Sequence, residues 1–502
     1  MRRTMLIATV AAATSALMAM ATNASEPALI PMPRELKLTG GSVTFAATNS
    51  PKVEVAASIP SEGYELSITK DGVTIRHSDG AGLFYARVTL EQLKDGRAVS
   101  TKPPPSAASS IPPYQTLPCL EIKDSPAFRW RGVHLGETQR LFGKGTIKRM
   151  LDLMSRYKFN VFHWHFTDDR GWRIDFPEYP NLARKSALPG LCGNDQALFY
   201  SANDVRDILA YAKARHITVV PELDFPGHSR AITTAYPNLA CPVKSKKRPN
   251  VLCMGNPETL KFAERAIDWV CETFPSEVIH IGGDECPRYF WEKCPRCKEF
   301  MKQHGMKSTT EIQPWFTRHL AEYVAKKGRK AIGWDDIATE HGNVAKALDA
   351  SVLPDRGSVM VMGYRCRDMI CASLAANMGY TVIQSPSRYT YFDYRQGLPD
   401  DPFSYFGHNV TPLETAYKFD PYEDVKSEAR KNVIGGQCCN WTKFTLHRYD
   451  LEWKMWPRAF ATAEVLWTYP DPAKRDFAEF SARAAEHRRR LIRERVNCAP
   501  LK

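Results

Sequence analysis

Short apolar stretches alternate with amphipathic stretches along the chain from Arg131 onward. The apolar stretches have the length of buried strands, and we expect eight: Gly132–Leu135, Asn160–Phe166, Ile217–Glu222, Val278–Ile281, Lys330–Trp334, Val359–Gly363, Thr381–Gln384 and Val433–Gly436. Between them, helical periodicity occurs in Thr146–Tyr157, Ala202–Arg215, Pro257–Thr273 and Glu311–Lys327. This alternation predicts an α/β fold, a (β/α)8 TIM barrel. A closing helix near Trp453–Leu466 favours the barrel over a doubly wound sheet, and we expect a last basic helix, near Ala473–Val496, to pack outside it.

The residues before the barrel predict a small α/β domain. Alternating stretches at Tyr64–Thr69 and Val73–Arg76 flank Asp71-Gly72, a turn signal typical of a β-hairpin. A helix is predicted near Ala81–Leu93. The stretch Lys102–Pro113 contains five prolines and indicates an exposed loop within this domain.

The first 24 residues have the features of a secretion signal. Arg2 and Arg3 precede the apolar run Met5–Ala21, and small residues around Ala21 and Ala24 offer cleavage sites. The run is short and rich in Ala and Thr for a membrane anchor, and no later segment reaches the ~18 apolar residues of a span. We therefore expect an exported protein, periplasmic or secreted, without stable membrane insertion. Its parts are the signal peptide at 1–24, the small domain at 25–124 and the barrel with its C-terminal helix at 125–502.

The overall composition is that of a globular protein, with 43% hydrophobic and 25% charged residues. The net charge of +13 is modest for 502 residues, and much of the excess lies in Lys244–Arg248 and Arg488–Arg495. Because no basic stripe with interleaved aromatic residues is present, we interpret both clusters as solvated faces and expect no nucleic-acid partner.

Thirteen cysteines follow the signal segment. Cys294 and Cys297 form a CxxC pair that could be half of a zinc site. No second CxxC and no matching His pair accompanies it, so the pattern favours a disulfide or free thiols there. Neither a metal nor another cofactor is expected.

Carboxylates and tryptophans gather where the predicted strands end. The acidic residues at these positions are Glu137, Asp168, Asp169, Asp224, Asp284, Glu285, Asp335 and Asp336, and the tryptophans are Trp164, Trp172, Trp334 and Trp441. The strand C-termini of such a barrel carry its active site. Carboxylates with aromatic platforms are typical of a sugar site, because pyranose rings have apolar faces and hydroxyl edges. Neither GxGxxG nor GxxxxGK[ST] is present, which argues against a phosphate site.

The segment that ends in Asp284-Glu285 is the strongest candidate for acid catalysis. It places two adjacent carboxyl groups after a predicted strand and the paired glycines Gly282-Gly283. Two neighbouring carboxyls do not ionise equally easily. One stays charged while the pKa of the other rises, which suits a general acid.

The chain resembles glycoside hydrolase family 20, the β-N-acetylhexosaminidases, over nearly all of its length after the signal. The stretches that carry the resemblance are Arg131-Gly132, Lys158–Arg173, Pro221–His228, His280–Glu285, Ile332–Asp336, Tyr391–Tyr394, Gly435–Lys443 and Trp456–Trp467. The family also carries a small α/β domain before its barrel.

The resemblance implies substrate-assisted catalysis with retention of configuration, an exception to the two-carboxylate scheme. Asp284 would orient the substrate's acetamido group, Glu285 would act as acid and then base, and Tyr391 would bind the acetamido oxygen. Asp168 and His228 would support the acid. Trp334 and Trp441 would wall the sugar, and Asp393 would bind substrate. The family uses no metal at positions such as His163 and His165, which are expected to pack and hydrogen-bond.

Three departures from the family pattern concern the edge of the sugar site. Gln139 stands where the family has an arginine that grips the sugar's 3- and 4-hydroxyls, and Lys443 stands where it has a carboxylate. One wall tryptophan is missing, and Tyr364 is its nearest substitute. The chemistry-bearing residues are retained, which favours altered substrate choice over lost activity.

The sequence thus predicts an exported retaining exo-β-N-acetylhexosaminidase whose partner is a glycan substrate with terminal GlcNAc or GalNAc. One alternative is the same mechanism on a substituted GlcNAc, either extended (lacto-N-biosidase-like) or 6-sulfated. Another is a non-catalytic glycan-binding protein. A glycan on the sequon at Asn440 would obstruct the site, so we interpret the sequon as unused, which favours a bacterial host. The oligomeric state is not predicted.

Overall fold

The computed structural model describes residues 27–46, 50–95, 114–185, 199–340, 343–347, 355–365, 371–402 and 409–501. The predicted signal peptide and the proline-rich segment 102–113 lie outside these ranges. Within them, no helix combines the length and the apolar character that a membrane crossing requires.

The N-terminal residues form a five-stranded sheet with the order β1-β5-β3-β4-β2. Its elements are β1 (Glu35–Ala46), β2 (Lys52–Val55), β3 (Tyr64–Thr69), β4 (Gly72–His77), α1 (Gly80–Asp95) and β5 (Tyr114–Asp124). Strands β3 and β4 pair antiparallel, which confirms the predicted hairpin, and alternate residues of β3 are buried. The sheet packs its apolar face against α1.

The second part is a closed barrel of eight parallel strands, as predicted. In chain order the strands are β6 (Trp130–Gly136), β7 (Val161–His165), β10 (Thr218–Phe225), β11 (Val278–Gly282), β12 (Lys330–Trp334), β15 (Val359–Gly363), β16 (Val382–Gln384) and β17 (Val433–Asn440). Most of their residues are buried, because side chains fill the barrel on one face and helices cover the other.

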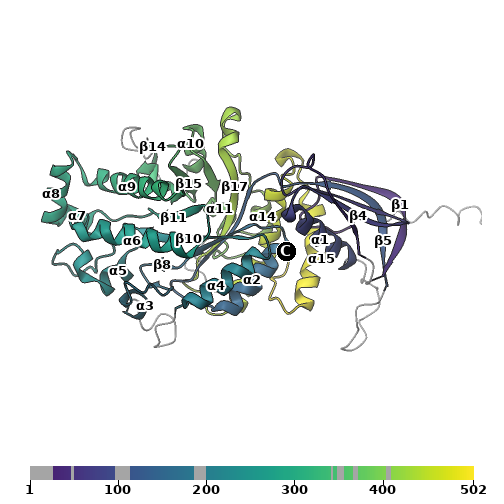
Figure 1. Cartoon of the computed structure of the whole chain (residues 1–502), viewed down its shortest axis with the longest axis horizontal. Coiled ribbons are helices and arrows are strands. Elements are labelled where there is room, and N and C mark those ends of the chain that lie inside the picture. Colours follow the sequence, from purple (N-terminus) through teal and green to yellow (C-terminus); the bar gives the residue numbers. More distant parts are fainter. Residues whose placement is uncertain are drawn as a thin grey trace, which may run out of the picture.

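Helices follow the barrel strands and form the outer layer (Figure 1). They include α2 (Lys144–Arg156), α4 (Ala202–Lys213), α6 (Pro257–Thr273), α9 (Ile312–Lys326), α10 (Cys371–Asn377), α13 (Arg448–Met455) and α14 (Arg458–Trp467). Further elements lie in the connections: β8 (Thr167–Asp168), β9 (Gly171–Trp172), α3 (Asn181–Lys185), α5 (Arg230–Ala235), α7 (Tyr289–Lys293), α8 (Pro295–Gln303), β13 (Thr339–Glu340), β14 (Asn343–Ala347), α11 (Ser387–Thr390) and α12 (Leu413–Tyr417). The closing helix, predicted as one, is divided into α13 and α14 at Trp456-Pro457, since proline cannot continue a helical hydrogen-bond ladder.

A buried ion pair and the C-terminal helix join the two parts. Lys158 follows α2, and its Nζ atom lies 2.9 Å from Asp124 Oδ2 at the end of β5. Both side chains are almost fully buried. Helix α15 (Phe477–Arg493) lies between the barrel and the sheet (Figure 1). Its Arg490 Nη1 donates to the Gln92 carbonyl of α1 at 3.1 Å.

Candidate active site

The end of β11 turns sharply and presents Asp284 and Glu285. Gly282 and Gly283 have φ values of +66° and +94°, in the left-handed region that glycine adopts readily. A Cβ atom on Gly282 would lie 2.0 Å from Asp224 Oδ1, so no other residue fits there. Glu285 itself has a φ of +45°, and its backbone N–H donates to Asp336 Oδ2 at 2.8 Å. The turn therefore fixes the direction of both carboxyl groups.

The two carboxyl groups occupy different environments. Asp284 is buried, whereas the Glu285 side chain is 58% exposed. Burial, with the nearby carboxylates of Glu222 and Glu285, raises the pKa of Asp284 to about 7. A hydrogen bond with His228 lowers the pKa of Glu285 below its ordinary value. The two pKa values shift in opposite directions, but the raised pKa belongs to Asp284 and not to Glu285, the expected acid, because Glu285 is the more solvated.

His228 joins these carboxylates to Asp168. Its Nε2 atom lies 3.5 Å from Asp284 Oδ2 and 3.6 Å from Glu285 Oε2, and its Nδ1 atom lies 3.0 Å from Asp168 Oδ1. Burial opposes a charge on the imidazole, but the carboxylates of Asp284 and Asp168 outweigh it and raise the pKa of His228 well above its ordinary value. The pKa of Asp168 is lowered by His228 and His165 despite its own burial. His228 is therefore charged, with its Nδ1–H donating to Asp168 and its Nε2 atom at ion-pair distance from Asp284 and Glu285.

Arg365 is a site residue that the sequence reasoning missed. It follows β15, and its Nε and Nη2 atoms donate to Asp336 at 2.7 and 2.9 Å. Its Nη2 atom also lies 3.9 Å from Glu285 Oε1. Nothing in the sequence around Arg365 distinguishes it from surface arginines, apart from its place directly after a barrel strand. Its guanidinium adds a positive charge beside the exposed carboxylate.

Four aromatic side chains form a connected group at the same end of the barrel. Trp334 lies 5.5 Å from Tyr364 and 6.0 Å from Trp441 between ring centroids. Tyr391 lies 6.3 Å from both Tyr364 and Trp441. Burial raises the pKa of Tyr391 well above its ordinary value, so its hydroxyl stays protonated and can donate. The structure thus brings together Trp334, Tyr364, Tyr391 and Trp441. The other two tryptophans predicted at the strand ends, Trp164 and Trp172, are fully buried in a separate apolar cluster and do not join this group.

A cluster of histidines under Trp334 supports this group from inside the barrel. Glu222 lies 3.0 Å from His163 and 2.5 Å from His165, and its other oxygen accepts from Trp334 Nε1 at 2.7 Å. His165 also lies 3.4 Å from Asp168. His163 and His165 therefore hydrogen-bond and pack as predicted, and they link the position of Trp334 to that of Asp168.

Asp393 lies two residues after Tyr391 and is buried. Burial raises its pKa to about 7. Its Oδ1 atom has no hydrogen-bond partner among the described residues. Since an unpaired buried polar atom is costly, a hydroxyl group of a ligand would stabilise it.

Gln139 and Lys443 follow neighbouring strands. Gln139 comes after β6 and Lys443 after β17, which pair in parallel, and the Thr442 hydroxyl donates to the Gly136 carbonyl. Trp441 also packs over Gly136, where a Cβ atom would lie 3.4 Å from the indole ring. Both residues therefore lie at the rim that carries Trp441, while their roles toward a ligand stay predictions.

A cavity of about 420 Å³ lies between the segments that follow β10 and β11. It is lined by Arg230, Lys247, Arg248, Asn250, Pro287, Tyr289 and Phe290. Arg230 and Pro287 are each two residues from His228 and Glu285, respectively. A ligand that extends from the carboxylates into this cavity would meet cationic groups.

Two family models match the chain. "Glycosyl hydrolase family 20, catalytic domain" matches residues 128–470, and "Glycosyl hydrolase family 20, domain 2" matches residues 47–125. The beta-hexosaminidase of Porphyromonas gingivalis is 36% identical over 444 residues, which cover 86% of this chain and 54% of that protein. The beta-hexosaminidase of Vibrio furnissii is 30% identical over 84% of this chain and 67% of its own length. The aligned region thus spans about half of the Porphyromonas protein.

Solved structures show the same architecture. The GH20 exo beta-N-acetylglucosaminidase of Vibrio harveyi, in complex with N-acetylglucosamine, has a TM-score of 0.82 and 25% identity, covering 94% of this chain and 78% of that chain. The beta-N-acetylhexosaminidase of Bacteroides fragilis has a TM-score of 0.79 and 28% identity, covering 94% of this chain and 97% of that chain.

Proposed function

The chain belongs to glycosyl hydrolase family 20, and on that basis we propose that it is a retaining exo-β-N-acetylhexosaminidase. It hydrolyses terminal β-linked GlcNAc or GalNAc from glycans by substrate-assisted catalysis. The observation that carries this proposal is the pair Asp284 and Glu285, one buried and one exposed, held against His228 beside an aromatic group.

In the first step the substrate supplies its own nucleophile. The acetamido oxygen attacks the anomeric carbon, the bond to the leaving oxygen breaks, and an oxazolinium ion forms. Asp284 accepts a hydrogen bond from the acetamido N–H and stabilises the developing positive charge, and its burial strengthens both interactions. The Tyr391 hydroxyl donates a hydrogen bond to the acetamido oxygen and directs this oxygen toward the anomeric carbon.

Glu285 carries the proton that this chemistry needs. It protonates the leaving oxygen as the glycosidic bond breaks, then removes a proton from the water that opens the oxazolinium ring from the opposite face. The product keeps the β configuration because the anomeric carbon is inverted twice. His228 and Arg365, 3.6 and 3.9 Å from the two Glu285 oxygens, stabilise the carboxylate that remains after proton transfer.

The aromatic group gives the pocket its preference for an N-acetyl sugar. The ring centroids of Tyr364 and Trp441 lie 5.5 and 6.0 Å from that of Trp334, and the Trp334 indole N–H donates to Glu222. Rings in this arrangement enclose the acetamido methyl and stack on the apolar face of the pyranose. Asp393 binds a sugar hydroxyl through its unpaired oxygen.

A second candidate is the same mechanism on a substituted GlcNAc. The observation that favours it is the pair Gln139 and Lys443, which follow adjacent strands at one rim. Glutamine lacks arginine's rigid fork of donors and leaves more space, which suits an extended sugar. The Lys443 ammonium donates where a carboxylate would accept, which suits a 6-sulfate. The export signal predicted at residues 1–24 supports the proposal that either activity acts outside the cytoplasm, on glycans of the periplasm or the surroundings.

The test is to incubate the purified protein with natural oligosaccharides that end in β-GlcNAc, β-GalNAc, 6-sulfo-GlcNAc or galactosyl-GlcNAc, and to identify the products by mass. Release of the unsubstituted monosaccharide supports the first candidate. Release of a sulfated sugar or a disaccharide with little monosaccharide supports the second. Binding without release from any of them would overturn both and favour a glycan-binding protein.

A further inference from the structure

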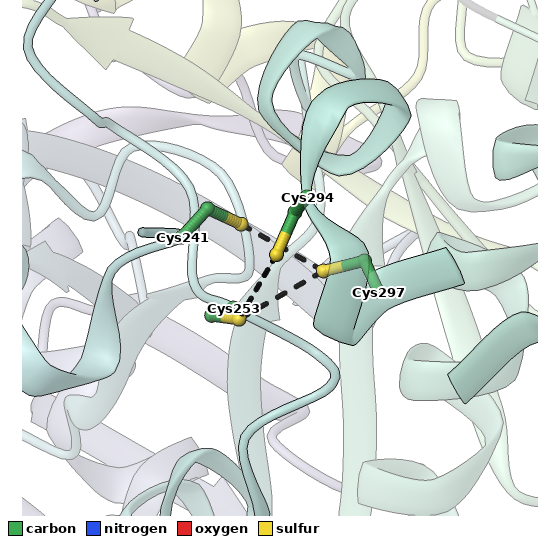
Figure 2. Close-up of side chains that lie close together, drawn as sticks. All are labelled: Cys241, Cys253, Cys294 and Cys297. Carbon is green, nitrogen blue, oxygen red and sulfur yellow. Dashed lines mark hydrogen bonds between the residues drawn. The ribbon is translucent and has the colours of Figure 1, made fainter. Parts of the chain in front are cut away.

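Four cysteines from two loops that follow different barrel strands meet outside the barrel. Figure 2 shows the sulfur atoms of Cys241, Cys253, Cys294 and Cys297 pointing toward one common point. All four are buried, with at most 3% of their surface exposed. Their four sulfur atoms lie within 4.8 Å of one another. The CxxC pair is thus completed by Cys241 and Cys253, whose spacing gives no second CxxC to recognise.

The distances between the sulfur atoms match a tetrahedron around one metal ion. Cys241 and Cys297 are 3.7 Å apart, and Cys253 is 3.8 Å from both Cys294 and Cys297. A tetrahedral zinc ion with Zn–S bonds of about 2.3 Å has S–S edges of about 3.8 Å. A disulfide would need about 2.05 Å. None of the four clustered cysteines is in a disulfide.

We propose that Cys241, Cys253, Cys294 and Cys297 bind one Zn²⁺ ion as a closed tetrathiolate site. Soft thiolate ligands in a tetrahedral arrangement select zinc among the common divalent ions. All four coordination positions belong to the protein, and the cluster is buried, so the ion has no open position for a substrate and is structural. This proposal replaces the expectation of a disulfide or free thiols at Cys294 and Cys297, and with it the expectation that the chain needs no metal.

The backbone around the four cysteines is built for close approach. A Cβ atom on Gly255 would lie 2.1 Å from the Arg296 carbonyl oxygen, so glycine is required where the Cys253 turn meets the CxxC turn. Trp291 Nε1 donates to the Leu252 carbonyl at 2.8 Å and ties the same two segments together. Cys253 and Cys294 each precede a helix, α6 and α8, which anchor the turns.

The site joins the two loops that carry the catalytic machinery. Cys241 and Cys253 lie in the segment after β10 that also holds His228, and Cys294 and Cys297 lie in the segment after β11 that begins with Asp284 and Glu285. Nearer the barrel, a Cβ atom on Gly227 would lie 3.0 Å from the Asp284 carbonyl oxygen, so the loops already touch there. A metal ion at their outer ends would hold His228 against Glu285. This consequence rests on the proposed function, whereas metal binding does not.

The first test is the metal content of the full-length wild-type protein. The protein is purified from cells without added metal, dialysed against a chelating resin, and measured by elemental mass spectrometry with native intact mass. We expect about one zinc per chain. A protein without bound zinc, in which the four cysteines are free thiols or form disulfides, would overturn the proposal.

The second test uses matched variants and cobalt. Cys297→Ser should lose most of the bound zinc and unfold at a lower temperature, whereas Cys271→Ser, a half-buried cysteine outside the cluster, should retain both properties. If Cys297→Ser does not fold, cobalt(II) exchanged into the wild type gives the answer. Intense absorption typical of tetrahedral thiolate cobalt supports the site, and spectra of octahedral cobalt contradict it.

The third test concerns the link to the active site. Removal of zinc from the folded wild-type protein should lower kcat, and addition of zinc should restore it. If the proposed function is wrong, the metal content and the thermal unfolding results of the first two tests are unchanged. Unchanged kcat in a folded, zinc-free protein would overturn the role of the ion in positioning His228.

Discussion

The Nε2 atom of His228 lies 3.6 Å from the Oε2 atom of Glu285, across two different barrel loops. Because the pKa of His228 is raised and that of Glu285 is lowered, the two groups form an ion pair in the ligand-free protein. Asp168 holds the opposite ring nitrogen at 3.0 Å. Glu285 is thus linked through His228 to Asp168 in the barrel interior, so the charges of His228 and Asp168 set the proton affinity of the acid.

The pH dependence of kcat/KM should be bell-shaped, with the alkaline limb near pH 7. Asp284 has a pKa of about 7 and Glu285 has a pKa below its ordinary value. Between these two values the pair holds one proton, and the active form is the one in which Glu285 carries it while the ionised Asp284 accepts from the acetamido group. Above about pH 7 the pair loses that proton, and at low pH both carboxyls are protonated. Asp284→Asn should move the alkaline limb to lower pH, and an unchanged limb in that variant would show that the pair does not titrate together.

Glu285→Gln removes the transferable proton while keeping the side chain's shape. Natural glycans with poor leaving groups should lose roughly 10²–10⁴-fold in kcat, and activated aryl glycosides should lose less in the first step. Glu322→Gln, at an exposed position of α9, serves as the control. Steady-state kinetics on both substrate types provide the measurement, and a wild-type rate on natural substrate would exclude Glu285 as the acid.

Asp168→Asn should weaken the interaction that positions His228 without changing a group that contacts the substrate. The carboxylate's charge supports the imidazolium, so the variant should lower kcat by roughly 10–100-fold through misplacement of the acid's partner, with a smaller change in KM. It should also shift the pH profile, which a purely structural defect would not do. The exposed Asp400→Asn is the matched control. Equal pH profiles for the two variants would contradict the role given to Asp168.

Gln139 and Lys443 are expected to set the choice of substrate at the sugar's edge. If a sulfate is recognised, Lys443→Glu should lose about 10–150-fold in kcat/KM for the 6-sulfated substrate alone. If an extended sugar is recognised, Gln139→Arg should block the galactose-extended glycan and spare the monosaccharide glycoside. Both variants are measured against plain, sulfated and extended GlcNAc glycosides. Equal effects on all three would show that these positions do not determine specificity.

The fold could be predicted because each level of the sequence agrees with it. Parallel barrel strands are buried on both faces and leave unbroken apolar runs. The predicted helix Pro257–Thr273 has the observed bounds because Asn256 caps it at 3.1 Å and proline opens it. The carboxyl groups of Asp284 and Glu285 could be predicted as site residues because a strand and two glycines precede them.

The features of the site that could not be predicted from the sequence depend on contacts between distant segments. Arg365 follows β15 and reaches Glu285, which follows β11, because only β12 lies between these two strands in the barrel, and the sequence around Arg365 carries no signal of this contact. The cysteine cluster unites positions up to 56 residues apart without a repeated motif. Likewise, the pKa of Asp284 rises because of burial, which adjacent letters in a sequence do not reveal.

The most direct test of the central claim is the kcat/KM of the wild-type protein for an aryl β-N-acetylglucosaminide against that for the matching aryl β-glucoside. Substrate-assisted catalysis requires the acetamido group as nucleophile, so the N-acetyl substrate should be hydrolysed and the glucoside should be essentially inert. Efficient hydrolysis of the glucoside would contradict the mechanism, and hydrolysis of neither substrate, nor of any substituted GlcNAc glycoside, would contradict the assignment of Asp284 and Glu285 as an active site.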